Sequence, residues 1–302
     1  MTARLLLLFV DGIGLAPGGE GNPFSTVPMP ELVRLLGGPL TLESCREAPE
    51  IVLRPIDATL GVAGLPQSAT GQTALLTGVN APAALERHVA AFPGPRLGAL
   101  LAEHSVLRRV EALGGRALFA NALTPGYFAE VERGTRRHSA TTLAALAAEG
   151  AVLGVDDLLA GRAATWDVTG EFLAERAGVC VAPVAPEEAG RRLAALAASY
   201  DFTLWETFMT DLAGHGRWGW TAAEALGRLD GLLGGVVRAR AADLTVLLTS
   251  DHGNLEEAEH RRHTRNPVPL LAFGPLAGRF AALTALDQVT PAILAALADR
   301  PS

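Results

Sequence analysis

Lysine is absent from this chain of 302 residues, and all 25 residues counted as Lys or Arg are arginines. The absence excludes Schiff-base enzymes, which need a lysine amine. It also excludes P-loop nucleotide hydrolases and protein kinases, which place a lysine on the nucleotide phosphates. Any fixed positive charge must come from arginine, which binds oxyanions as a planar fork, or from a metal ion.

Cysteine and net positive charge are also scarce. The two cysteines, Cys45 and Cys180, match no metal-binding or redox spacing, so we expect two buried, reduced thiols in a cytoplasmic protein. The net charge of -7 leaves no basic stripe for nucleic-acid phosphates or an anionic membrane surface. We therefore expect neither nucleic acid nor membrane as a partner.

Long apolar runs are missing as well. No run approaches the roughly 20 residues that a membrane-spanning helix needs. The run Leu5–Val10 ends at Asp11-Gly12 without a small-residue cleavage site, which favours a buried strand over a signal peptide.

Short apolar runs alternate along the chain with longer runs rich in alanine and leucine. Uninterrupted apolar strands between helices are typical of a sheet buried on both faces, so we predict an α/β fold with a mostly parallel sheet and helices on both faces. The expected strands are Leu5–Val10, Ala117–Ala120, Phe202–Phe208, Leu244–Thr249 and Leu270–Phe273. The expected helices are Pro30–Leu36, Thr70–Thr77, Pro95–Leu113, Ser139–Ala148, Pro186–Ser199, Thr221–Arg240 and Thr290–Ala298.

The chain is expected to form a single domain over residues 1–302. The segment 83–182 has the least regular pattern and could include a small lid over the sheet. The sequence does not specify an oligomeric state.

Polar residues stand at the carboxyl ends of the expected strands, the edge at which open α/β sheets bind ligands. Carboxylates and imidazoles without a thiolate suit Zn²⁺ or Mn²⁺, and six such ligands are too many for one tetrahedral ion. Two ions about 3.5–4 Å apart would suit phosphoryl-type chemistry. The candidate ligands are Asp11, Asp211, His215, Asp251, His252 and His263.

Two spacings among these residues are informative. Asp211 and His215 are four residues apart, so a helical turn or a tight loop would bring both to one face. Asp251 and His252 are adjacent, and at a strand end they would point to opposite sides and reach different ions or different sides of one site.

A nucleophile candidate, Ser68, stands where loop residues give way to an apolar run at Ala74–Leu76. This pattern predicts a helix start with Ser68 at or just before the N-cap, where free backbone N–H groups favour anions. A plain N-cap is the alternative for Ser68, and Thr70 is the reserve nucleophile.

Sequence blocks with a family signature run from residue 9 to residue 269. On these blocks the chain resembles the alkaline phosphatase superfamily, on its side of cofactor-independent phosphoglycerate mutases and phosphopentomutases. The blocks are Phe9-Val-Asp-Gly-Ile-Gly14, Ser68-Ala-Thr-Gly71, Tyr200-Asp-Phe with Asp211-Leu-Ala-Gly-His215, Ser250-Asp-His-Gly-Asn254 and His263-Thr-Arg-Asn-Pro-Val-Pro269.

The resemblance implies a fold, an activity and residue roles. It implies an alkaline-phosphatase-like core that binds two divalent metal ions, Mn²⁺ or Zn²⁺, with Ser68 as the nucleophile. One ion would lie among Asp11, Ser68, Asp251 and His252. The other would lie among Asp211, His215 and His263.

Other residues receive weaker roles from residue type alone. Asn254 and Asn266 are expected to hold the ligand loops by hydrogen bonds. Arg136, Arg137 and the adjacent His138 could bind a substrate phosphate, although an exposed arginine pair is the more common situation. Trp218 and Trp220 could line a substrate pocket, pack in the core or contact a lid.

The family's phosphoglycerate mutases carry a large second domain between the nucleophile and the later ligands, and phosphopentomutases carry a sizeable lid. Only about 140 residues separate Ser68 from Asp211, several of them in expected core elements. A mutase must keep water from its intermediate, so a chain with little room for a lid favours hydrolysis.

We therefore predict a metal-dependent phosphohydrolase that acts on a small phosphate monoester through a phosphoserine intermediate. The alternatives are a phosphomutase of the phosphoglycerate or phosphopentose type and a metal-binding protein without catalysis.

Overall fold

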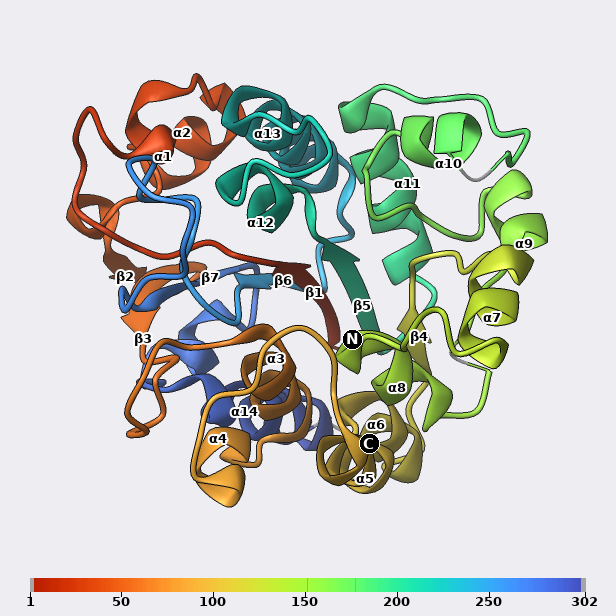
Figure 1. Cartoon of the computed structure of the whole chain (residues 1–302). Helices are drawn as coiled ribbons and strands as arrows, with labels where there is room; N and C mark the ends of the chain where they lie inside the picture. Colours follow the sequence, from red (N-terminus) through yellow and green to blue (C-terminus); the bar gives the residue numbers. More distant parts are fainter. Residues whose placement is uncertain (1–2, 151, 177, 300–302) are drawn as a thin grey trace.

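A mixed β-sheet with helices on both faces forms the centre of the structure, a computed structural model that describes residues 3–150, 152–176 and 178–299 (Figure 1). Within these residues the sheet has seven strands in the order β2-β3-β7-β6-β1-β5-β4. The strands are β1 (Arg4–Val10), β2 (Arg46–Ala48), β3 (Ile51–Ile56), β4 (Ala117–Phe119), β5 (Phe202–Thr207), β6 (Leu244–Thr249) and β7 (Val268–Phe273).

The middle of the sheet is parallel. β1 pairs in parallel with both β5 and β6, and β4 pairs in parallel with β5 at the edge. β7 runs antiparallel to β6, β3 antiparallel to β7, and β2 antiparallel to β3. The carboxyl ends of β1, β3, β4, β5 and β6 and the start of β7 therefore lie along one edge.

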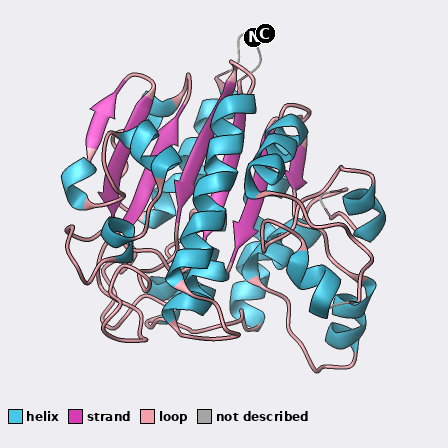
Figure 2. Ribbon diagram, turned by 90° about the horizontal axis from the view of Figure 1, so that it is seen from above, coloured by secondary structure: helices cyan, strands magenta, loops and turns pink. Residues whose placement is uncertain are grey.

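Helices cover both faces of the sheet (Figures 1 and 2). Above it in Figure 1 lie α1 (Pro23–Thr26), α2 (Pro30–Leu36), α11 (Pro186–Ala197), α12 (Met209–Gly214) and α13 (Ala222–Ala239). Below it lie α3 (Ser68–Thr77), α4 (Ala81–Leu85), α5 (Pro95–His104), α6 (Val106–Ala112), α8 (Ala140–Leu146) and α14 (Val289–Ala298). Beyond the β4 edge lie α7 (Pro125–Glu132), α9 (Val155–Leu159) and α10 (Glu171–Arg176).

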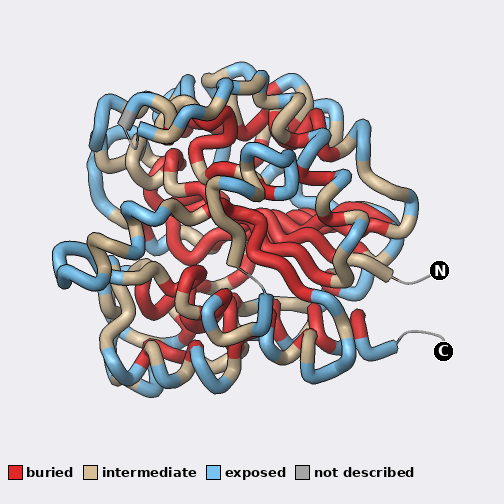
Figure 3. Tube along the Cα trace, turned by 90° about the vertical axis from the view of Figure 1, so that its right-hand side faces the viewer, coloured by how far each residue is buried: buried red, intermediate tan, exposed pale blue. Residues whose placement is uncertain are grey.

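The sheet divides the core into two apolar clusters. Leu5, Leu7 and Phe9 of β1 face the cluster below the sheet, and the alternate residues Leu6 and Leu8 face the one above it. Because both faces are covered, every residue of β5, β6 and β7 is buried (Figure 3). This burial explains the uninterrupted apolar runs, and it confirms the predicted fold class.

All the expected strands and helices are present, with shifted ends in most cases. The expected helix Pro95–Leu113 is two helices, because Ser105 leaves the helical region and begins α6 as its N-cap. The sequence prediction missed β2 and β3, and it missed the short helices α1, α4, α7, α9, α10 and α12.

The prediction of buried cysteines is wrong, since Cys45 and Cys180 are both free and exposed. Neither cysteine lies in a strand of the sheet, and the apolar character of the thiol alone does not place a residue in the core. Among the described residues, none of the helices combines the length and the apolar character that crossing a membrane requires.

Candidate metal centre

The predicted ligands meet at the sheet edge where β1, β5 and β6 end. Asp11 follows β1 directly, and Asp251 and His252 follow β6 after a single residue. Asp211 lies in α12, which begins just after β5. Because β7 runs antiparallel to β6, the segment with His263 that leads into β7 returns to the same edge. Sheet topology thus gathers side chains from distant parts of the sequence.

The first group of side chains surrounds the Nε2 atom of His252. The Ser68 hydroxyl lies 3.0 Å from this nitrogen. The nearest carboxylate oxygens of Asp11 and Asp251 lie 3.4 Å and 3.5 Å from it. The ligand atoms of Asp11, Asp251 and His252 lie within 4.8 Å of one another, and all three residues are buried. A single cation could therefore contact the whole group.

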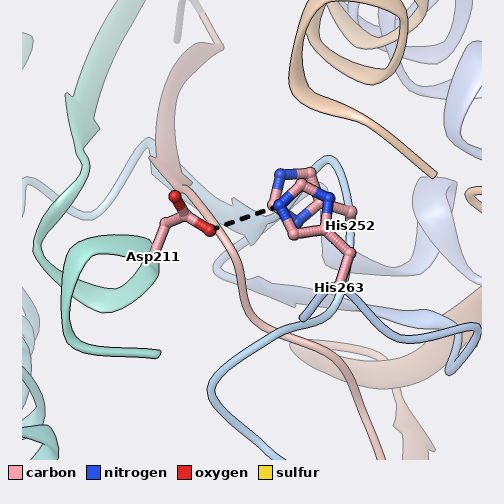
Figure 4. A group of neighbouring side chains, drawn as sticks. All are labelled: Asp211, His252 and His263. Carbon is pink, nitrogen blue, oxygen red and sulfur yellow. Dashed lines mark ion pairs between the residues drawn. The ribbon is translucent and has the colours of Figure 1, made fainter. Parts of the chain in front are cut away.

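The second group surrounds the Oδ1 atom of Asp211. The Nε2 atoms of His215 and His263 lie 3.3 Å and 3.7 Å from this oxygen and 3.2 Å from each other. The ring of His263 also stacks on that of His252, with 3.6 Å between centroids, so His252 lies against both groups (Figure 4). The two groups are therefore contiguous.

Asp251 and His252 depart from the expected arrangement. Their side chains converge, with 3.5 Å between the Asp251 Oδ2 and His252 Nε2 atoms, instead of pointing to opposite sides. The strand ends at Thr249, and both residues lie in a bend, where the alternation of a strand no longer applies. Asp211 and His215 do follow the expectation: Asp211 lies in α12 and His215 is its C-cap, so the helical turn brings the two side chains to one face.

The imidazoles of His215 and His263 share an orientation that turns Nε2 into the cluster. The Nδ1 atom of His263 lies 2.9 Å from the carbonyl oxygen of Pro66, and that of His215 lies 3.0 Å from the carbonyl oxygen of Arg261. A ring that donates through Nδ1–H to a carbonyl presents the lone pair of Nε2, which is the arrangement found around ligating histidines.

Ser68 is the first residue of α3, and the N-cap is Gln67. The serine side chain therefore does not cap the helix, and its hydroxyl contacts His252. Thr70, the reserve nucleophile, is fully buried and uses its hydroxyl locally: it donates to the Gln67 carbonyl and accepts from the Val89 amide. The geometry favours Ser68 over Thr70.

Glycines allow the backbones around the site to approach closely. A Cβ atom on Gly71 would lie 2.7 Å from the carbonyl oxygen of Asp251, so α3 can approach the end of β6 only with glycine there. Gly12 has a φ of 73°, and a Cβ atom on it would lie 2.7 Å from the Asp211 Cβ atom.

The carboxylates and imidazoles of the cluster shift one another's pKa. Burial raises the pKa of Asp11 well above its ordinary value, and the negative charges of Asp251 and Asp211 raise it further. Burial also opposes ionisation of Asp211, but a hydrogen bond from His215 and the positive charge of His252 hold its pKa at about 2. Burial and the charge of His252 lower the pKa of His263. Crowded carboxylates of this kind require a proton or a cation nearby.

Two buried polar side chains at the site were missed in the sequence. The Gln72 amide donates to Asp251 Oδ2 at 3.0 Å and to Asp11 Oδ2 at 3.4 Å. Glu206 lies in β5, and its Oε2 atom is buried without a hydrogen-bond partner. The signals were available: Gln72 stands one helical turn after Ser68, and Glu206 is a lone carboxylate in an apolar strand.

Glu256, also missed, holds the ligand loops together. Its carboxylate accepts from the backbone amides of Gly14 and Asn254, each at 2.8 Å, and from the side chain of Asn266. Asn254 in turn donates to Asp211 Oδ1 at 2.7 Å. Asn254 thus contacts a candidate ligand, whereas Asn266 contacts only the loop that supports the ligands.

The arginines that were expected to bind substrate are engaged elsewhere. Arg136 forms an ion pair with Glu130 and lies over the ring of Tyr127, and Arg137 lies over the ring of Phe92. Their role in substrate binding stays a prediction.

Comparison with known proteins gives the family of the chain. The sequence model of the Metalloenzyme superfamily matches residues 3–298. The chain belongs to the Metalloenzyme superfamily. Membership implies that the protein binds divalent metal ions, and it confirms the resemblance drawn from the motifs.

Two curated relatives match part of the chain. The 2,3-bisphosphoglycerate-independent phosphoglycerate mutase of Cellvibrio japonicus is 32% identical over 126 residues, which are 39% of this chain and 24% of that protein. The mutase of the same name from Aliivibrio fischeri is 33% identical over 120 residues, 37% of this chain and 24% of that protein. The aligned region therefore spans about a quarter of each relative.

Solved structures share the fold over the whole chain. A protein from Pyrococcus horikoshii has a TM-score of 0.58 at 15% identity and is covered to 98%, with all of this chain aligned. The alkaline phosphatase from the Antarctic bacterium TAB5 has a TM-score of 0.56 at 14% identity, with 98% of each chain covered. At these identities the likeness extends to the fold alone.

Proposed function

We propose that the protein is a two-metal phosphohydrolase that cleaves a small phosphate monoester through a phosphoserine intermediate. The observation that carries the proposal is the position of the Ser68 hydroxyl, 3.0 Å from His252 Nε2 within a cluster of three carboxylates and three imidazoles. A nucleophile beside such a cluster suits phosphoryl transfer.

The side chains present fit a pair of divalent cations. They offer hard oxygen and borderline nitrogen donors without a thiolate, and the set suits Mn²⁺ or Zn²⁺. The buried Asp11 Oδ1 atom has no hydrogen-bond partner among the described residues, which leaves it free for a cation. Asp11, Ser68, Asp251 and His252 would hold one ion.

Asp211, His215 and His263 would hold the second ion. When bound, the ions would neutralise charge on the phosphoryl oxygens and lower the pKa of the Ser68 hydroxyl.

The residues of the chain account for the remaining steps. Ser68 stands at the N-terminus of α3, where the backbone N–H groups of a helix favour an anion such as a phosphoryl group. The Ser68 oxygen loses its proton as it attacks phosphorus and forms a new P–O bond. The P–O bond to the alcohol breaks, and the alcohol oxygen keeps the electron pair and takes up a proton. Water then cleaves the phosphoserine, which releases phosphate and restores the serine hydroxyl.

The second candidate is a phosphomutase, favoured by the identity with part of two phosphoglycerate mutases. The hydrolase ranks first because the segment 83–182 contributes largely to the core. Its strand β4 extends the sheet, and α5, α6 and α8 supply buried residues to the lower apolar cluster. We infer a single domain over 1–302 with at most a small lid formed by α7, α9 and α10. A cytoplasmic location stays a prediction.

The test uses the purified protein with Mn²⁺ or Zn²⁺ and a panel of phosphate monoesters that includes 3-phosphoglycerate. We expect phosphate release by the wild type, loss of at least a hundredfold in Ser68→Ala, and no change in the exposed control Ser25→Ala. Unchanged turnover in Ser68→Ala would refute the nucleophile. Formation of 2-phosphoglycerate without free phosphate would establish the mutase instead, and metal content would distinguish Mn²⁺ from Zn²⁺.

A further inference from the structure

Aromatic rings gather beside the metal centre in a chain that has few of them. Aromatic residues make up only 5% of the sequence, with four tryptophans. Three of these tryptophans join two phenylalanines in one cluster, with ring centroids 4.7–6.4 Å apart. The aromatic cluster consists of Trp166, Phe172, Phe208, Trp218 and Trp220.

The cluster is continuous with the ligand-bearing segment. Phe208 is the N-cap of α12, the helix that carries Asp211. Trp218 follows His215 by three residues, so its Cα lies within about 11 Å of that of His215. The other contributors, Trp166 and Phe172, come from the segment 83–182, and α10 carries Phe172. The cluster therefore joins the candidate small lid to the metal centre.

Trp218 differs from the other members of the cluster. It is 60% exposed, more than any other large apolar side chain among the described residues. Its φ of 57° is a left-handed conformation that bulky residues rarely adopt. Its ring stacks on Phe172 with 5.5 Å between centroids and 14° between planes. One face is thus backed by Phe172, and much of the indole remains open.

Core packing accounts for Trp166, which contacts four rings, but it does not account for an exposed indole in a strained conformation. The neighbouring charges suit an anionic ester. Arg217 precedes Trp218, and the Arg261 guanidinium lies against Gly216. Neither arginine forms an ion pair with a described residue, whereas Glu257 in the loop of Arg261 pairs with His260.

We propose that Trp218, backed by Phe172, binds a planar aromatic ring on the alcohol part of the substrate. This inference rests on the proposed function, since it assumes that the phosphoryl group lies at Ser68. The substrate class is then an aromatic phosphate monoester, either an aryl phosphate or a nucleoside monophosphate, whose ring extends the stack of Phe172 and Trp218.

The test compares Trp218→Asn with the wild type on phenyl phosphate, adenosine monophosphate, glucose 6-phosphate and glycerol 3-phosphate. Asparagine removes the ring and tolerates the left-handed conformation. Ratios of variant to wild type cancel the intrinsic reactivity of each ester. We expect kcat/KM for the aromatic esters to fall about tenfold through KM, and values for the two other esters to stay constant. Trp218→Phe should restore the aromatic esters, and the similarly exposed Leu113→Asn should change none.

A binding measurement separates this inference from the proposed function. Phenyl phosphate titrated into the Ser68→Ala protein with Mn²⁺ should bind about tenfold more weakly when Trp218→Asn is added. If the wild type hydrolyses nothing but this difference persists, the proposed function fails and the ring site stands. Equal losses for all four esters, no loss, or a selective loss for glucose 6-phosphate would each overturn the ring site. The relative effect on phenyl phosphate and adenosine monophosphate identifies which aromatic ring is preferred.

Discussion

Glu206 should destabilise the folded, metal-free protein in a way that depends on pH. Burial raises the pKa of its carboxyl to about 8; a hydrogen bond from Thr141 opposes the rise and the negative charge of Asp251 adds to it. In the unfolded chain the same group ionises near its ordinary value of 4.5. Between these two values the unfolded state releases a proton that the folded state retains, so stability falls as the pH rises.

The size of the effect follows from the same two values. Each pH unit within the window changes the free energy of unfolding by about 1.4 kcal/mol. Glu206→Gln resembles the protonated side chain and has no charge to lose. We therefore expect the variant to be about 3 kcal/mol more stable than the wild type at pH 7, and less than about 1 kcal/mol more stable at pH 5.

The assay is urea unfolding followed by circular dichroism at pH 5, 6, 7 and 8, with a chelator present. Stability differences come from the transition midpoint at constant slope. Glu20→Gln, a change of an exposed glutamate in the loop before α1, provides the matched control and should give no trend with pH. A gain in Glu206→Gln that is equal at pH 5 and pH 7, or a loss at both, would refute the reasoning.

Three further outcomes are expected. Gly71→Ala should destabilise the protein by about 1–3 kcal/mol and reduce turnover, because the new methyl group would push α3 away from the Asp251 carbonyl. Urea unfolding measures the first effect and steady-state kinetics the second. Wild-type stability and turnover in the variant would contradict the close approach of α3 to Asp251. Asn254→Ala removes the 2.7 Å hydrogen bond to Asp211 and should weaken Mn²⁺ binding about 10–100-fold in calorimetry, whereas an unchanged affinity would separate Asn254 from the metal centre. Removing metal with a chelator should lower the free energy of unfolding by about 2.7 kcal/mol for each site that was filled at 100 times its Kd. Adding Mn²⁺ or Zn²⁺ should restore the lost stability. A melting temperature that does not change when the chelator is added would argue against both sites.

The sequence predicted the fold where the physical signal was local and strong. The apolar run Leu244–Thr249 matches β6 at both ends, because a strand buried on both faces needs no polar residue. The prediction from the sequence failed for β2 and β3, where Arg46, Glu47 and Arg54 interrupt the apolar pattern near an exposed edge of the sheet. It also failed at Ser105, since nothing in the composition indicates that the chain turns there between two helices.

The candidate site divides in the same way. The residue types and spacings of Asp211, His215 and the block around Asp251 predicted the candidate ligands, and the structure gathers these side chains at one edge of the sheet. Spacing could not reveal that Asp251 and His252 converge, because that depends on where β6 ends. Nor could the spacing reveal that Glu256 accepts hydrogen bonds from backbone amides of two loops that are far apart in the sequence.

The sequence by itself determined the chemistry available to this protein. The set of aspartates and histidines and the ordered motifs identified the Metalloenzyme superfamily, and the absence of lysine excluded lysine-dependent chemistry. Only the tertiary structure decided which groups share a charge environment and which aromatic rings meet. Proximity between β1, β5, β6 and α3 arises from parallel crossovers and burial of the sheet. Hydrogen bonds, pKa values and ring stacking act through space over a few ångströms, which the order of residues along a chain does not specify.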